Sequence, residues 1–142
     1  MIIDEVAEAT VEILKQLKVT YEKVDIIPTP EDIYEHNKKR DPGTAVVWRN
    51  CWTKFRIFDQ TQFDKIIFLD ADIMILQNLD HLFELPHMTA AMDGEYFGLW
   101  PTWPHFNSGC LVIEPSHQLF EDILNFASSL NEDNIPDYVI AD

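Results

Sequence analysis

A short apolar run that ends in two acidic residues places the strongest constraint on the fold of this chain. Residues 66–69 are Ile-Ile-Phe-Leu, and Asp70 and Asp72 follow directly. Such a run predicts a strand that is buried on both faces, as in a parallel sheet. Alternation along a strand places both carboxylates on one side of the backbone at its C-terminal end. Open α/β sheets bind their ligands at that end.

The two acids predict a metal site. Two carboxylates so close together repel each other unless a cation neutralises them, and such oxygens are ligands that Mg²⁺ and Mn²⁺ prefer. The simplest use is a divalent metal that joins the protein to a phosphate-bearing ligand. One alternative is that the acids only cap the next turn. Another is a phosphatase of the haloacid-dehalogenase type, in which the first Asp is a nucleophile and the second a general acid. That type has Thr or Val and commonly Gly after its acids, so the Ile-Met-Ile at 73–75 counts against it.

Composition excludes several classes of function. The 142 residues suit one domain, and 46% hydrophobic residues indicate a folded protein with a real core. A net charge of −15 argues against nucleic-acid binding through a basic surface and against a polybasic membrane contact. It does not exclude an anionic ligand, because a bound metal can invert the local field. No apolar run approaches the roughly 20 residues of a membrane span. Cys51 and Cys110 are interpreted as free core thiols, because their spacing fits no metal motif.

Helical and strand patterns alternate along the chain, which predicts an α/β fold. We expect helices from Met1 to about Leu17, over Trp48–Phe63, and from a Ser116 N-cap to Leu130. Glu31–Gly43 is a charged loop or short helix, and Asn78–Phe83 a helical turn. The predicted strands are Val19–Ile27, Ile66–Leu69, Thr89–Met92 and Cys110–Ile113. There is no internal repeat or inner domain boundary.

Three further features are candidates for a binding site. Asn107, Ser108 and Gly109 precede a predicted strand; Gly109 permits close backbone approach and Asn107 can donate and accept hydrogen bonds, which suits a polyhydroxyl ligand. A plain turn is the alternative. Residues 93–106 combine five aromatic residues with Gly and Pro, so their rings either stack on sugar faces or fold onto the core. Lys54 lies on the helix that leads into the acidic strand and can counter a phosphate.

Four segments together resemble the family-8 glycosyltransferases. They are Trp52–Phe58, Phe63–Asp72, Asn78–Phe83 and Phe106–Ser116. The nearest branches are the glycogenin-like enzymes and the plant glucuronosyltransferases that resemble them. The resemblance implies a GT-A fold with a Rossmann-like central sheet. It also implies Mn²⁺-dependent transfer (Mg²⁺ being the alternative metal) of a hexosyl or glucuronosyl unit from a UDP-sugar to a carbohydrate or related hydroxyl acceptor, with retention of configuration.

The resemblance also implies roles for single residues. Asp70, Ala71 and Asp72 match the metal-binding Asp-x-Asp: Asp72 ligates the metal through its carboxylate, and Asp70 bridges the metal and the donor ribose. Lys54 matches a Lys that approaches the donor. Asn107, with Ser108 and Gly109, matches the segment near the transferred sugar. Asp142 matches the Asp of an Asp-Gln pair that faces the donor sugar, and it is the candidate nucleophile if retention proceeds through a covalent intermediate.

The family pattern contains parts that this chain lacks. Its opening strand, which holds the uracil ring, and its third metal ligand, a His in a later segment, have no counterpart here; the histidines present are interpreted as ordinary polar or capping residues. We therefore expect residues 1–142 to be the central part of a single family-8 catalytic domain. A non-catalytic fragment or remnant is the alternative. The donor sugar, the acceptor, a homodimer, and a cytosolic or Golgi location are left open.

Overall fold

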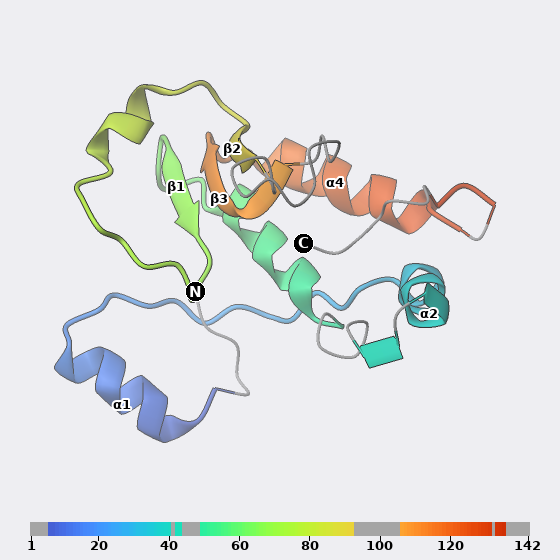
Figure 1. Ribbon diagram of the computed structural model, residues 1–142, viewed down its shortest axis with the longest axis horizontal. Coiled ribbons are helices and arrows are strands. Elements are labelled where there is room, and N and C mark those ends of the chain that lie inside the picture. Colours follow the sequence, from blue (N-terminus) through green and yellow to red (C-terminus); the bar gives the residue numbers. More distant parts are fainter. Residues whose placement is uncertain (1–5, 41, 44–48, 93–105, 132, 136–142) are drawn as a thin grey trace, which may run out of the picture. The chain divides into compact units, whose positions relative to one another are not determined.

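The computed structural model describes residues 6–40, 42–43, 49–92, 106–131 and 133–135. The chain divides into two compact units, which are treated separately below. Unit 1 contains residues 1–56 and 131–141, and unit 2 contains residues 57–130 and 142. Helices and strands are both present (Figure 1), so the predicted α/β class is confirmed. Among the described residues, no helix has the length and apolar character needed to cross a membrane.

Unit 1 holds two helices, α1 (Glu8–Gln16) and α2 (Glu31–Arg40). The amphipathic helix predicted near the N-terminus is confirmed as α1, although it buries none of its residues. The charged segment that was predicted as a loop or short helix is a helix. Ile33 and Tyr34 bury its apolar side, with 0% and 8% of their surface exposed, whereas Lys38 and Lys39 face solvent. A charge run on the outer side of a helix is what the sequence pattern predicts.

The strand predicted over Val19–Ile27 is wrong. This segment is extended, but it forms only an isolated bridge at Lys23 and belongs to no sheet. Side chains of Thr53 and Arg56 also bond the backbone of this segment. The Ile27 N–H donates to Thr53 Oγ1 at 3.0 Å, and the Asp25 carbonyl accepts from Arg56 Nε at 3.3 Å. Because buried backbone groups need partners of some kind, side chains can satisfy an extended segment without a ladder.

The helix predicted over Trp48–Phe63 is shorter and of another type. It is the 3₁₀ helix η1 (Cys51–Asp59), and Trp48 lies outside the described residues. The aromatic residues Trp52, Phe55 and Phe58 recur every three positions, which is the period of a 3₁₀ helix. Trp52 and Phe58 are buried, and Trp52 meets the Phe55 ring edge-to-face at 5.2 Å between centroids. The stripe is therefore core, as its spacing indicates.

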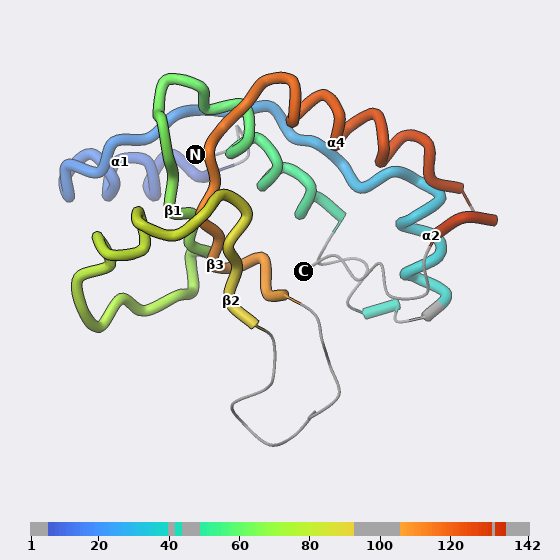
Figure 2. Tube along the Cα trace, turned by 90° about the horizontal axis from the view of Figure 1, so that it is seen from above, coloured from blue at the N-terminus to red at the C-terminus, as the bar shows by residue number. Residues whose placement is uncertain are grey.

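Unit 2 contains a three-stranded sheet of order β1-β3-β2, formed by β1 (Ile66–Leu69), β2 (Thr89–Met92) and β3 (Phe106–Ile113) (Figures 1 and 2). The three strands predicted for this part of the chain are present, but β3 begins four residues earlier than expected. The expectation of a parallel sheet is wrong, because β1 and β2 both pair with β3 in the antiparallel direction. β1 is only half-buried. The best-buried strand residues, Leu111 to Ile113, lie in β3, which has a neighbour on each side.

The helical elements of unit 2 follow the sequence prediction. The turn at 78–83 is the 3₁₀ helix η2 (Asp80–Glu84), and the C-terminal helix is α4 (His117–Ser129). Ser116 caps α4 as predicted, since its hydroxyl accepts from the Leu119 N–H at 3.3 Å. Phe120 and Ala127 bury the apolar face of α4.

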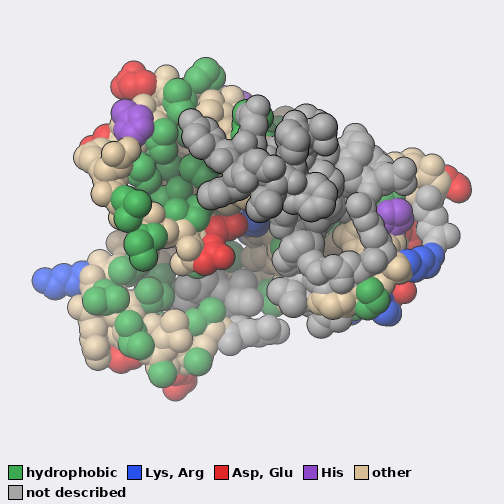
Figure 3. Space-filling view, viewed as in Figure 1, with side chains coloured by type: hydrophobic (Ala, Val, Ile, Leu, Met, Phe, Trp, Pro, Cys, Tyr) green, Lys and Arg blue, Asp and Glu red, His purple; other side chains and the backbone are tan. Residues whose placement is uncertain are grey.

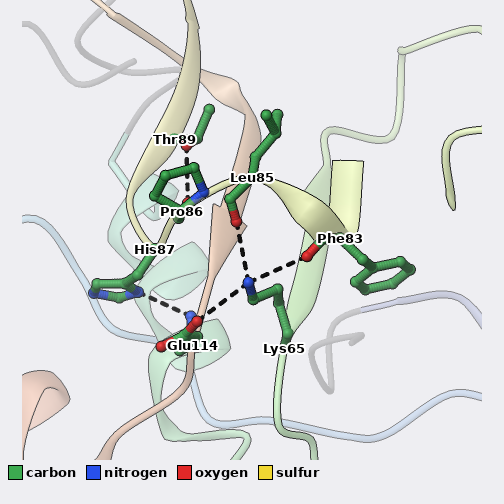
Figure 4. A network of polar contacts seen from close by, with 7 residues as sticks. All are labelled: Lys65, Phe83, Leu85, Pro86, His87, Thr89 and Glu114. Carbon is green, nitrogen blue, oxygen red and sulfur yellow. Dashed lines mark hydrogen bonds and ion pairs between the residues drawn. The ribbon is translucent and has the colours of Figure 1, made fainter. Parts of the chain in front are cut away.

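A network around Lys65 joins the sheet to the loop between η2 and β2 (Figure 4). Lys65 Nζ donates to the carbonyls of Phe83 and Leu85 at 3.2 and 3.0 Å, and it forms an ion pair with Glu114 at 3.2 Å. The Glu114 N–H donates to His87 Nδ1 at 2.9 Å. Lys65 precedes β1 and Glu114 follows β3, so one ammonium group holds two strands and a loop at the same end of the sheet.

Replacing Lys65 by Met should destabilise the chain. The variant keeps a long apolar side chain but loses the ammonium donor, so we expect the free energy of unfolding to fall by about 1–2 kcal/mol in urea denaturation. Lys15→Met is the matched control, because Lys15 is exposed and its pair with Glu12 spans 3.7 Å on a helix surface. It should cost less than about 0.5 kcal/mol. Equal losses in both variants would contradict the role given to Lys65.

A second prediction concerns the pH dependence of stability. His117 Nδ1 lies 2.7 Å from Asp59 Oδ1. The hydrogen bond to Asp59, followed by its negative charge, raises the pKa of His117 above its usual value. A raised folded-state pKa means that this pair stabilises the fold fully below the unfolded pKa of about 6.5, and that its contribution disappears as the pH rises through the folded value.

The free energy of unfolding should therefore fall less between about pH 5.5 and pH 8.5 in His117→Gln than in the wild-type chain, because the variant has no His117–Asp59 pair to lose. Urea unfolding at both pH values measures this difference. His81→Gln is the control, since His81 is an exposed histidine of unit 2 that makes no ion pair among the described residues. An unchanged pH profile in His117→Gln would show that the pair does not contribute.

Candidate functional site

The first acid of the Asp-x-Asp motif is held by the sheet. β1 ends at Leu69, which pairs with Cys110 of β3. The Asp70 N–H then donates to the Gly109 carbonyl at 2.8 Å, so the ladder continues one residue beyond the strand. Asp70 is half-buried. The Asp70 backbone is therefore fixed against the middle strand β3. The position of Asp70 directly after β1 agrees with the strand predicted from the sequence.

The second acid lies in a turn. Ala71 and Asp72 are exposed turn residues, and the Ile73 N–H closes the turn by donating to the Asp70 carbonyl at 3.1 Å. Strand alternation therefore does not reach Asp72. The reason is that the chain leaves the sheet directly after Asp70.

The apolar residues 73–76, which follow the acidic turn in the sequence, contribute little to the core. Met74 and Leu76 expose 81% and 85% of their surface. Figure 3 shows hydrophobic side chains gathered at the upper left, over the segment that follows β1 in Figure 1. The acidic turn is thus anchored through β1, not through the apolar residues after it.

The Asn-Ser-Gly segment forms a bulge in the middle strand. Ala90 of β2 pairs with Leu111, but the next residue, Ala91, pairs with Asn107. Three residues of β3, 108–110, therefore stand opposite no residue of β2. Bulges of this kind bend a strand and redirect its side chains, and they often lie next to active sites. The sequence alternative of a plain turn before the strand is wrong, because the segment lies inside β3.

The bulge brings Asn107 and Asp70 to the same place. The Gly109 N–H donates to Asn107 Oδ1 at 2.7 Å, so the Asn107 side chain folds back over Gly109. A Cβ atom placed on Gly109 would lie 2.8 Å from Asn107 Oδ1 and 3.0 Å from Asp70 Oδ2. Both oxygens therefore converge over the same glycine from different strands, although the two motifs are far apart in the sequence.

This convergence brings hydrogen-bonding groups of two motifs to the same glycine. Asn107 Oδ1 accepts from the Gly109 N–H, and its Nδ2 bonds none of the described residues. The Asn107 amide therefore offers a donor, and the Asp70 carboxylate near Gly109 offers acceptors. A hydroxyl group can use both kinds of partner, because it donates one hydrogen bond and accepts others. Ser108, which stands between Asn107 and Gly109 in the sequence, is buried and exposes 7% of its surface.

The charge distribution favours a cation at this end of the sheet. Residues 57–130 contain eleven Asp and Glu but a single Lys or Arg, Lys65, whereas residues 1–56 contain ten acids and nine bases. Lys65 lies at the opposite end of β1, where it contacts Glu114 and the Leu85 carbonyl. The sequence around Asp70 and Asp72 is therefore strongly acidic.

The two carboxylates fit a hard divalent cation by their chemistry. Among the described residues, no group of three or more His, Cys, Asp or Glu gathers around one point. Two carboxylates suit Mn²⁺ or Mg²⁺ when ligand oxygens and water complete the coordination, as is usual for a metal that carries phosphates.

The roles of all the predicted site residues stay predictions, and two of these residues are not brought to Asp70 and Asn107 by the described structure. Lys54 is a half-buried residue of η1 in unit 1, whereas Asp70, Asp72 and Asn107 belong to unit 2. Asp142 lies outside the described residues, as do residues 93–105 of the aromatic segment. The sequence did not predict that Gly109 lies close to both Asp70 and Asn107. Only the pairing of β1 with β3 could have indicated it.

The sequence of the chain is similar to those of known proteins. The family model described as Glycosyl transferase family 8 matches residues 1–141. UDP-glucuronate:xylan alpha-glucuronosyltransferase 2 of Arabidopsis thaliana is 40% identical over 79 residues, which are 56% of this chain and 12% of that protein. Glycogenin-1 of Oryctolagus cuniculus is 33% identical over 119 residues, which are 80% of this chain and 32% of that protein. The chain thus spans less than a third of the length of either relative. Helices with a small antiparallel sheet are consistent with an incomplete GT-A fold.

Proposed function

Because the chain belongs to glycosyltransferase family 8, we propose that it supplies the metal and donor-sugar site of a UDP-sugar transferase. The proposed reaction moves a hexosyl or glucuronosyl unit to a carbohydrate or related hydroxyl acceptor, with retention of configuration. It depends on Mn²⁺, with Mg²⁺ as the alternative. Residues 1–142 are then the central part of one catalytic domain. The similarity to a glycogenin and to a glucuronosyltransferase supports glycosyl transfer as the class of reaction.

The observation that carries the proposal is the convergence of Asp70 and Asn107 over Gly109. Asp70 has a carboxylate that can accept from a ribose or sugar hydroxyl, and the Asn107 amide, whose Nδ2 bonds none of the described residues, supplies a donor from the other motif. Asp72 follows in an exposed turn, where its carboxylate can reach a metal. A nucleotide-sugar carries both the hydroxyl groups and the diphosphate that such a site requires.

Each residue then has a distinct task. Asp72 ligates the metal, and Asp70 holds both the metal and the donor ribose. Asn107 orients the transferred sugar through its Nδ2 donor. Holding a substrate in a reactive geometry lowers the activation free energy of the reaction. Lys54 is proposed to contact the donor phosphates. When bound, the divalent metal acts as a Lewis acid that neutralises the charge on the departing diphosphate.

Retention can follow two routes. In the first, a carboxylate attacks the anomeric carbon from the face opposite the leaving group, and the acceptor then displaces it. Asp142 is our candidate for that carboxylate. In the second, the acceptor attacks from the same face as the departing UDP, and no protein nucleophile is needed. The Asp142→Asn variant of a protein that contains this segment distinguishes them, because only the first route loses its covalent intermediate.

The proposal is tested by titrating UDP into the chain with and without Mn²⁺ in a calorimeter. We expect binding that requires Mn²⁺ and weakens by more than about tenfold, or about 1.4 kcal/mol, in Asp72→Ala. The double variant Asp70→Ala/Asp72→Ala should not bind. Asp64→Ala is the matched control, because Asp64 is an exposed acid of the same unit and its loss changes the net charge equally.

Other outcomes point to the competing functions. A folded chain that does not bind UDP would contradict the proposal and favour a non-catalytic module. Mg²⁺-dependent release of phosphate through an aspartyl-phosphate on Asp70 would instead indicate the phosphatase. Binding that is equal in Asp72→Ala and Asp64→Ala would show that the metal site is elsewhere.

A further inference from the structure

Gly109 occupies an unusual position in the sheet. It lies in the bulge of β3, it is buried, and its carbonyl accepts from the Asp70 N–H at 2.8 Å. Its own N–H donates to Asn107 Oδ1 at 2.7 Å. The φ angle of Gly109 lies outside the left-handed region, so its backbone conformation is open to any L-amino acid. Glycine is therefore not required here by the backbone, and the reason must lie in the space around it.

The space above Gly109 is filled by two oxygens. A Cβ atom would stand 2.8 Å from Asn107 Oδ1, closer than real Cβ atoms approach another heavy atom. The same atom would stand 3.0 Å from Asp70 Oδ2 and 3.5 Å from Asp70 Cγ. Even one methyl group would thus force at least one of the two side chains to move.

We propose that Gly109 is a positioning residue: its missing side chain sets the separation between the Asp70 carboxylate and the Asn107 amide. Gly109 acts through these two groups and needs no contact with a ligand. The consequence for nucleotide-sugar binding rests on the proposed function. The spacing itself rests only on the distances above.

Asn107 is the side chain that should give way. Its side chain is exposed and is held by a single hydrogen bond among the described residues. Asp70 is half-buried and is tied to Gly109 through the backbone, so moving it would disturb the β1–β3 ladder. A methyl at position 109 should therefore turn the Asn107 amide away and break its bond to the Gly109 N–H. The Asn107 amide would then no longer lie over Gly109 together with the Asp70 carboxylate, while the sheet would stay paired.

The test combines two variants in a double-mutant cycle. Gly109→Ala should lower the midpoint of thermal unfolding, and it should lower it less when Asn107 is already Ala, because the closest clash is then absent. This arm needs no ligand. In the second arm, the Kd for UDP with Mn²⁺ should rise by about tenfold or more in Gly109→Ala, but by about threefold or less when the change is made in the Asn107→Ala background.

Val112→Ala separates positioning from general destabilisation. Val112 is 2% exposed in the same strand, pairs away from the bulge, and makes no contact proposed for the site. It should lower the unfolding midpoint, because it leaves a cavity, but it should leave the Mn²⁺-dependent Kd unchanged. Mn²⁺ paramagnetic resonance, which reports the free ion, gives the metal affinity independently in each variant.

Each outcome bears on one of the two claims. Equal shifts of the unfolding midpoint in both backgrounds would overturn the spacing role of Gly109, whatever the ligand does. A wild-type chain that does not bind UDP would overturn the proposed function, and the thermal cycle would still decide the role of Gly109. Binding that is unchanged in Gly109→Ala, when the wild-type chain binds, would overturn the inference.

Discussion

The antiparallel ladder between β1 and β3 is the interaction on which the candidate site depends. Leu69 pairs with Cys110, and the hydrogen bond from Asp70 to Gly109 carries the pairing one residue further. This extra bond places the first acid of one motif opposite the last residue of another. Neither motif alone contains both a carboxylate and an amide donor. Their combination is a property of strand pairing, and it places polar groups where a half-buried apolar strand ends.

The two ends of strand β1 differ in the charges that they carry. At the end where β1 begins, Lys65 compensates Glu114 and binds two carbonyls of the loop that leads to β2. At the end where β1 stops, Asp70 and Asp72 follow each other in a part of the chain that has no other Lys or Arg. A bound divalent cation would add positive charge there and would itself become the largest local charge in the site. The acidic composition of residues 57–130 is therefore compatible with an anionic ligand.

The bulge of β3 connects the sheet to the chemistry. The strand pairs with β2 on both sides of residues 108–110, so these residues can leave the β2 ladder without ending it. On the other edge, the same strand keeps its bonds to β1 and to Asp70. An uninterrupted strand would direct Asn107 along the regular pleat. The bulge instead lets it fold back on Gly109, where its amide oxygen and an oxygen of the Asp70 carboxylate both lie against the glycine.

The sequence alone determined the features that depend on a few neighbouring residues. The position of strand β1, the Ser116 cap of α4 and the family resemblance are local patterns, and the structure and the comparisons confirm them, whereas the metal-binding role of the two acids stays a prediction and β1 is less buried than its apolar run indicated. Tertiary structure decided the direction of the sheet, the absence of a strand over Val19–Ile27, and the meeting of Asp70 with Gly109. The physical reason is that a strand takes its direction, its register and sometimes its hydrogen-bond partners from residues distant in the chain. Periodicity records which residues are buried, but it does not record what they are buried against.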